Sequence, residues 1–174
     1  MIRVVVAAIG LVLCASALAG PGDFHAGSRI KGFGRIAAVD AAPKLPPETV
    51  LKVAFDVSEP GASDTVNRKL DSAARFINMH AAAGLRDDQV QVAVVVHGKA
   101  SQDLLTAEKL GRDNPNQALI AALIEAGVSI SLCGQTAAYY DIGAGDLLPG
   151  VNMALSAMTQ HALLQQQGYS LNPF

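Results

Sequence analysis

The chain has 174 residues, with 13 lysine and arginine residues against 15 aspartate and glutamate residues, a formal net charge of −2. This balance, without any run of basic residues, excludes the electrostatic surface of a nucleic-acid-binding protein. Hydrophobic residues make up 51% of the chain, but no stretch after the N-terminal region is long and apolar enough to cross a bilayer. Composition therefore predicts an alanine-rich α/β domain and does not indicate an activity.

The N-terminus has the layout of a secretory signal peptide. Arg3 supplies a positive charge, residues 4–13 are apolar, and Ala17-Leu18-Ala19 matches the small-x-small pattern before a cleavage site. The sequence therefore predicts a signal peptide at residues 1–19, export to the periplasm, and no membrane attachment after cleavage. A lipoprotein signal is the alternative because Cys14 lies in this region, although a lipobox has a small residue where Leu13 stands.

Cleavage after residue 19 would leave 155 residues with 12 basic and 15 acidic side chains, a net charge of −3, because Arg3 departs with the peptide. Cys133 would be the one cysteine of the mature chain, so no intramolecular disulfide could form. An unpaired thiol in an oxidising compartment is open to oxidation or wrong pairing unless it is buried or used.

Residues 20–48 are rich in glycine and proline, which indicates an extended leader before a domain at residues 49–174. Residues 32–39 could form a short strand or an arm on a neighbouring subunit. Within the domain, apolar runs predict strands at 50–57, 90–96, 128–132, 151–155 and 169–171. Helical periodicity and capping residues predict helices at 64–83, 101–110, from the Asn114 cap with Pro115 first to Gly127, at 134–140 and at 156–167.

This alternation of strands and helices predicts a parallel sheet covered by helices on both faces. In such sheets, ligands and chemistry gather at the carboxyl ends of the strands. Cys133 lies at such an end, directly before a predicted short helix whose free amides would favour a thiolate. Gly134 allows a sharp turn there, and Gln135 and Thr136 add polar groups. The alternative is a buried and inert cysteine.

His97, followed by Gly98, ends the predicted strand at 90–96 and therefore points to the same rim as Cys133. On a neighbouring strand it could take the thiol proton or stabilise the thiolate; the alternative is a histidine that caps a loop. Asn78 is a further ligand-binding candidate that could reach this rim, with a structural role as its alternative. The other histidines, His161 among them, are interpreted as structural or as part of the leader. No spacing typical of a metal site or of a nucleotide-binding loop is present, so we expect no metal and no cofactor.

Four segments, taken in order and spacing, resemble the DsrE/DsrF-like family and specifically its exported members: VVVHGKA, NPNQALIAALIEAGVSISLCGQTAA, DLLPGVNMALSAM and LLQQQGYSLNPF. The resemblance covers residues 50–174. It implies a three-layer α/β sandwich with a mostly parallel sheet of about five strands, assembly into a homo-oligomer, and a part in sulfur trafficking. In the sulfur-relay members one cysteine carries sulfane sulfur as a persulfide; Cys133 is the matching residue here, and His97 is a candidate helper.

Three functional hypotheses follow. In the first, Cys133 accepts sulfane sulfur from a thiol or persulfide donor and passes it to an acceptor thiol. In the second, Cys133 and His97 bind a soft metal or a small ligand without catalysis. In the third, Cys133 is inert and the rim serves the assembly of an oligomer.

Overall fold

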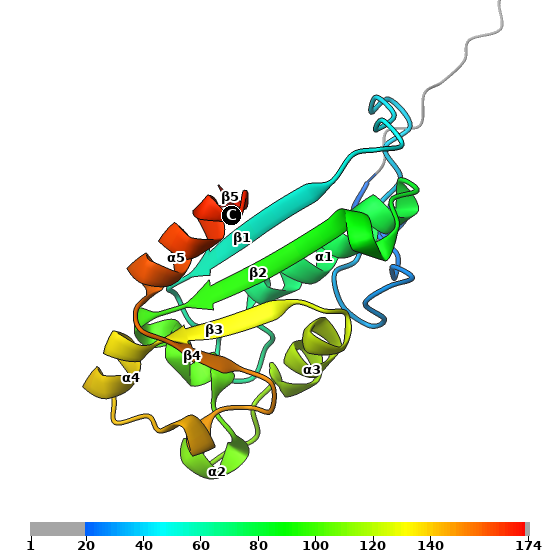
Figure 1. Ribbon diagram of the computed structural model, residues 1–174. Coiled ribbons are helices and arrows are strands. Elements are labelled where there is room, and N and C mark those ends of the chain that lie inside the picture. The colour runs from blue at the N-terminus through cyan, green and yellow to red at the C-terminus, as the bar shows by residue number, and fades with distance from the viewer. Residues whose placement is uncertain (1–19, 173–174) are drawn as a thin grey trace, which may run out of the picture.

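The computed structural model describes residues 20–172, so the predicted signal peptide and residues 173–174 lie outside the described residues. Within residues 20–172, five strands form one sheet in the order β4-β3-β2-β1-β5 (Figure 1). The strands are β1 (Leu51–Val57), β2 (Val90–Val96), β3 (Ser129–Cys133), β4 (Asn152–Ala154) and β5 (Ser170–Asn172). Every pairing is parallel. The predicted α/β class with a sheet of about five strands is therefore confirmed.

The α-helices are α1 (Arg68–Ala82), α2 (Ala107–Leu110), α3 (Gln117–Glu125), α4 (Gly134–Tyr139) and α5 (Ala157–Gln166). Short 3-10 segments occupy Pro21–Asp23, Asp87–Gln89, Gly98–Leu104 and Ala144–Asp146. None of the helices in the described part of the chain has both the length and the apolar character that a membrane span requires.

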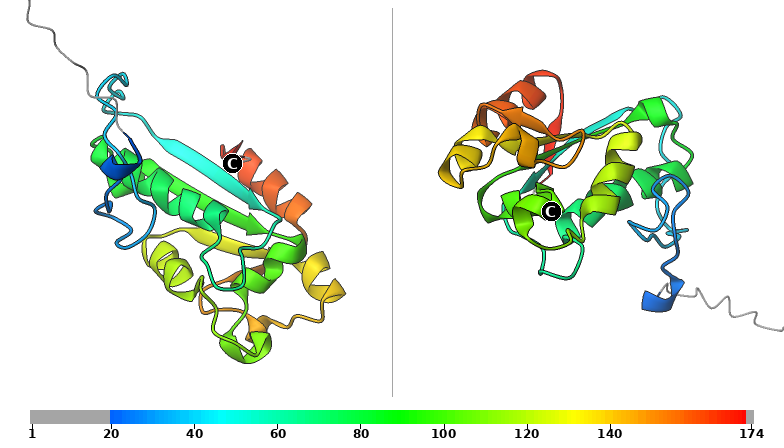
Figure 2. Two further views of the ribbon diagram at one scale, coloured as in Figure 1. Left: turned by 180° about the vertical axis from the view of Figure 1, so that it is seen from behind. Right: turned by 90° about the horizontal axis from the view of Figure 1, so that it is seen from below.

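The sheet is the middle of three layers. Helices α1 and α3 cover one face and α5 covers the other (Figure 2). Because side chains alternate along a strand, Phe55 and Val57 of β1 join the large core beneath α1 and α3, whereas Ala54 faces the opposite side. Ala54 packs there with Ala93 of β2 and Leu164 of α5.

Two helices start later than the sequence predicts. The helix expected at residue 64 begins after Asn67, because the Asn67 side chain accepts a hydrogen bond from the amide of Lys69 and so caps α1. Asn114 does not cap α3. Its side-chain oxygen accepts a hydrogen bond from the amide of Asn116 in a turn that precedes α3. Helix α3 itself begins at Gln117, so the predicted start at Pro115 is wrong. The predicted Ser156 cap of α5 is confirmed by its bond to the Thr159 amide.

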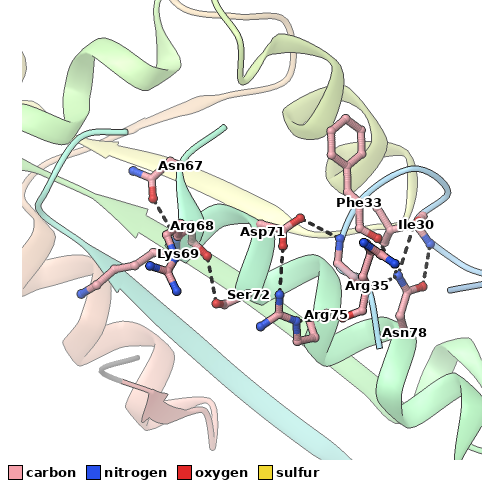
Figure 3. Close-up of polar contacts among 11 residues, drawn as sticks. Ile30, Phe33, Arg35, Asn67, Arg68, Lys69, Asp71, Ser72, Arg75 and Asn78 are labelled. Atoms are coloured by element: carbon pink, nitrogen blue, oxygen red, sulfur yellow. Dashed lines mark hydrogen bonds and ion pairs between the residues drawn. The ribbon is translucent and has the colours of Figure 1, made fainter. Parts of the chain in front are cut away.

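The segment before β1 packs on α1. Ile30 and Ile36 are buried, and Ile30 belongs to the large core. Asn78, fully buried on α1, accepts hydrogen bonds from the amides of Arg29 and Ile30 (Figure 3). Its amide nitrogen lies 3.0–3.2 Å from the carbonyl oxygens of Ile30, Phe33 and Gly34. A single side chain therefore fixes the turn of this segment against the domain.

Candidate functional site

Cys133 is the last residue of β3 and the N-cap residue of α4. The residue is only 6% exposed, but it lines a pocket of about 280 Å³ at the carboxyl ends of the strands. The predicted polar neighbours Gln135 and Thr136 line the same pocket, as does His97. The structure therefore gathers the predicted residues on the rim where parallel sheets place their ligands.

The N-terminal turns of two helices surround the Cys133 thiol. Burial raises the pKa of this thiol, whereas hydrogen bonding from the amide and hydroxyl of Thr136 and from the amides of Ala157 and Gln135 lowers it. The donors outweigh the burial, so the pKa lies below its ordinary value. Gln135 and Thr136 belong to the first turn of α4, and Ala157 begins α5; both helices start at the carboxyl end of the sheet (Figure 1). Free amides at helix starts favour an anion.

Two glycines shape the backbone of the pocket. A β-carbon added at Gly134 would lie 2.4 Å from the carbonyl oxygen of Ala154, so glycine permits α4 to begin tightly against β4. Gly98 has a φ of +59°, in the left-handed region that favours glycine. Its amide donates to the Thr136 hydroxyl at 3.1 Å, which ties the end of β2 to α4.

His97 follows β2 directly and is a neighbour of Cys133 in the sheet. Val96 pairs with Leu132 in the register of β2 and β3, so His97 and Cys133 occupy equivalent positions on strands about 4.8 Å apart. The imidazole nevertheless binds Asp56, whose two carboxylate oxygens each lie 3.2 Å from Nε2 of His97. Within residues 20–172 the hydrogen bonds of the His97 side chain lead to Asp56 and not to the thiol.

Asp56 and His161 belong to the same pocket, and sequence reasoning missed both. Nε2 of His161 lies 2.8 Å from Oδ1 of Asp56. The Asp56 carboxylate on β1 therefore contacts two imidazole rings, one from the end of β2 and one from α5. Burial raises the pKa of Asp56, but the hydrogen bonds from His161 and His97 outweigh burial, and the net pKa lies below its ordinary value. The carboxylate is therefore held in its ionised form.

Strand alternation carried a signal for Asp56. Val53, Phe55 and Val57 face the core beneath α1 and α3, so Asp56 faces α5 together with the residues that end β2 and β3. A carboxylate near the carboxyl end of this strand, on the face of His97 and Cys133, could have been identified from the sequence. His161 had no comparable signal, because its place depends on how α5 crosses the sheet.

The prediction that Asn78 reaches this rim is wrong. Helix α1 returns the chain from the carboxyl end of β1 to the start of β2, so it runs opposite to the strands and its last turns lie at their amino ends. Asn78 is near that end of α1, and its amide is occupied by the segment before β1 (Figure 3). It therefore has a structural role.

No group of three or more histidine, cysteine, aspartate or glutamate side chains is placed to hold a metal ion among residues 20–172. Cys133 and His97 offer two donor atoms, and the His97 ring already binds Asp56. A soft metal bound by Cys133 and His97 would therefore need ligands from groups other than these two residues. This gives the metal-binding hypothesis little support.

A larger cavity of about 600 Å³ lies away from Cys133, between α1, α3 and the segment before β1. Its wall is formed by apolar residues such as Ile77 and Ala122, with Arg29, Asp87 and Glu125 among the charged groups around them. Arg29 and Asp87 form an ion pair. No cysteine or histidine lines this cavity, so the chemistry of the molecule points to the pocket of Cys133.

Comparison with protein-family models matches residues 52–173 to the DsrE/DsrF-like family. Among solved structures, a protein of unknown function, MTH1491 from Methanobacterium thermoautotrophicum, has a TM-score of 0.56 and 22% identity, covering 71% of this chain and 99% of its own. The ychN protein from E. coli has a TM-score of 0.55 and 15% identity, covering 72% of this chain and all of its own. These similarities show a shared fold. A search of curated proteins found no significant relative.

Proposed function

The chain belongs to the DsrE/DsrF-like family, and from this premise we propose that it is a periplasmic sulfur-handling protein. Cys133 accepts a sulfane sulfur atom from a persulfide donor, holds it as a persulfide, and passes it to a second thiol. The observation that carries the proposal is a buried thiol whose pKa is lowered by helix-start amides at the floor of an open pocket. The thiolate is the nucleophile in sulfur exchange.

The transfer needs no external oxidant or reductant. In the loading step Cys133–S⁻ attacks the outer sulfur of R–S–SH; a sulfur–sulfur bond forms to Cys133, the donor's bond breaks, and R–S⁻ leaves with the electron pair. In the unloading step an acceptor thiolate attacks the outer sulfur of Cys133–S–SH and releases Cys133–S⁻. The sulfur atom keeps its oxidation state through both steps, so no resident cofactor takes part.

The same donors that stabilise the Cys133 thiolate would stabilise it as a leaving group in the unloading step. Thr136 offers an amide and a hydroxyl, and Ala157 offers an amide. A pocket of about 280 Å³ has room for one additional sulfur atom and the end of a donor. Met158, 80% exposed at the pocket's edge, leaves an apolar approach for an incoming thiol.

The location and assembly in this proposal rest on other features. The signal-peptide pattern of residues 1–19 supports export; a mature N-terminus at Gly20, measured on protein from the periplasmic fraction, is the expected result. Exposed apolar side chains near the site, Tyr139, Leu155 and Met158, support a homo-oligomer. Light scattering of the purified protein should give a multiple of the chain mass, and Leu155→Glu should reduce it.

The function is tested by mass spectrometry of the mature protein after incubation with excess persulfide donor. Wild type should gain the mass of one sulfur atom, which a thiol acceptor should then remove. Cys133→Ser should gain none. An unchanged wild-type mass would contradict sulfur handling, and a thiol that native labelling cannot reach would favour an inert, structural Cys133.

A further inference from the structure

Asp56, His97 and His161 form a cluster in which one carboxylate binds two imidazole rings. His97 approaches both oxygens of Asp56 through Nε2, and His161 approaches Oδ1 through its own Nε2. Each ring therefore contacts Asp56 through Nε2, which leaves Nδ1 as the second nitrogen that can bind a proton. The two Nδ1 atoms lie in different surroundings, which assigns different roles to the two histidines.

His161 is the less suited of the two to carry a proton. Its side chain is 16% exposed, and its Nδ1 is buried without a hydrogen-bond partner in the described residues. A proton on this atom would create a buried donor with no acceptor, which is unfavourable. Neutral His161 donates its Nε2–H to Asp56 and so fixes the orientation of the carboxylate.

His97 is placed to exchange protons with a substrate. Its side chain is 33% exposed, it lines the pocket, and it is level with Cys133 on the neighbouring strand. Its Nδ1 is not among the buried atoms that lack a partner. Asp56, anchored by His161, fixes the orientation of the His97 ring.

On the basis of the proposed sulfur transfer, we propose that His97 is the acid that protonates the thiolate leaving the donor, with Asp56 and His161 as positioning residues. The Cys133 thiol first gives its proton to His97. The resulting thiolate attacks the outer sulfur of R–S–SH. The donor's sulfur–sulfur bond breaks, and R–S⁻ leaves with the electron pair and takes the proton from His97. The balance is Cys133–SH plus R–S–SH giving Cys133–S–SH plus R–SH.

The acid role of His97 predicts which class of persulfide donor the site uses. A basic alkyl thiolate is a poor leaving group and gains most from protonation, whereas an acidic aryl thiolate leaves unaided. The pocket lining contains no lysine or arginine, so no fixed positive charge stabilises a departing anion. Outside the pocket lining, Lys69 of α1 donates from Nζ to the backbone carbonyl oxygen of Asp56 at 3.4 Å. The site therefore suits alkyl persulfides.

The test measures the loading rate of Cys133 with a series of persulfides whose leaving thiols range from alkyl to aryl. His97→Gln should slow loading from the alkyl donors by about 100-fold and from the aryl donors by less than about threefold. Asp56→Asn and His161→Gln should also slow loading more from alkyl donors than from aryl donors, but by less than His97→Gln does. His80→Gln is the matched control, because His80 lies on α1 and binds the Phe76 carbonyl oxygen; it should behave as wild type.

If the loading rates of wild type and His97→Gln depend on the leaving thiol in the same way, and sulfur is still added to Cys133, the acid role is overturned and the proposed function stands. No sulfur on wild-type Cys133 would overturn the proposed function and this inference with it. Should His97→Gln fail to fold, Asp56→Asn decides the question. Its loading rate should depend more strongly on the leaving thiol than that of wild type, and an unchanged dependence would overturn the inference.

Discussion

Asn78 and Cys133 are both buried polar residues, but they lie at opposite ends of the sheet and differ in what their polar atoms bind. Both hydrogen-bonding atoms of the Asn78 amide are occupied by backbone groups of the segment before β1. The Cys133 sulfur is surrounded by donors but lines an open pocket. A buried group whose bonds are all made within the chain stabilises the fold, whereas one with capacity left over can bind something else.

The largest expected effect separates the two residues by chemistry. Cys133→Ser should abolish sulfur loading but change the free energy of unfolding by less than about 1 kcal/mol, because serine is close in size and meets the same donors. Chemical denaturation of mature protein measures the stability. A loss of several kcal/mol would mean that the thiol is a core residue after all and would remove the contrast with Asn78.

Asn78→Ala should show the reverse. It leaves the amides of Arg29 and Ile30 and several carbonyl oxygens without partners, so we expect a loss of about 3 kcal/mol in the free energy of unfolding. The segment before β1 should also become sensitive to protease. The exposed Asn152 gives the control Asn152→Ala, which should be nearly neutral for stability. Sulfur loading by the folded fraction of Asn78→Ala should equal that of wild type.

The sheet and the rim were predictable because both follow from local pattern. Apolar runs set the strands, with residues 90–96 matching β2 at both ends, and the rule that parallel strands end at one rim placed His97 on the same rim as Cys133. Asp56 could have been added from strand alternation. The error at Asn78 came from reading its helix face without the helix direction, which a right-handed crossover would have supplied.

His161 could not have been found in this way. It is 105 residues from Asp56 in the chain, and its contact depends on the angle at which α5 crosses the sheet. Between α5 and the sheet, Leu164 packs in one cluster with Ala54 and Ala93. Such packing depends on how the helix and the sheet assemble, so the position of His161 beside Asp56 can be found only from the structure.

Gly134→Ala should have the next largest effect, because it displaces α4 without removing any polar group. The new methyl group would meet the backbone oxygen of Ala154 at 2.4 Å, and relief of this conflict should cost about 2 kcal/mol in stability. Movement of α4 should also weaken the hydrogen bonds of Gln135 and Thr136 to the thiolate and slow thiol labelling. Gly145→Ala is the control, because no atom lies within 4 Å of its added carbon. Equal stability of the two variants would contradict the tight start of α4.

Thr136→Val should have the smallest effect and tests the donors one by one. Loss of the hydroxyl removes one group that lowers the Cys133 pKa, so the pKa should rise toward its ordinary value. Because the folded pKa of this thiol is depressed, the thiolate contributes stability above the pKa of the unfolded chain, and this contribution is lost as pH falls through the folded pKa. At neutral pH alkylation of Cys133 should be roughly threefold slower in the variant, with the rate–pH curve displaced to higher pH. Thr106→Val, which alters the cap of α2, should leave the curve in place. Identical curves for Thr136→Val and wild type would mean that the backbone amides alone hold the thiolate, and the site would then differ from Asn78 in its openness rather than in its side-chain partners.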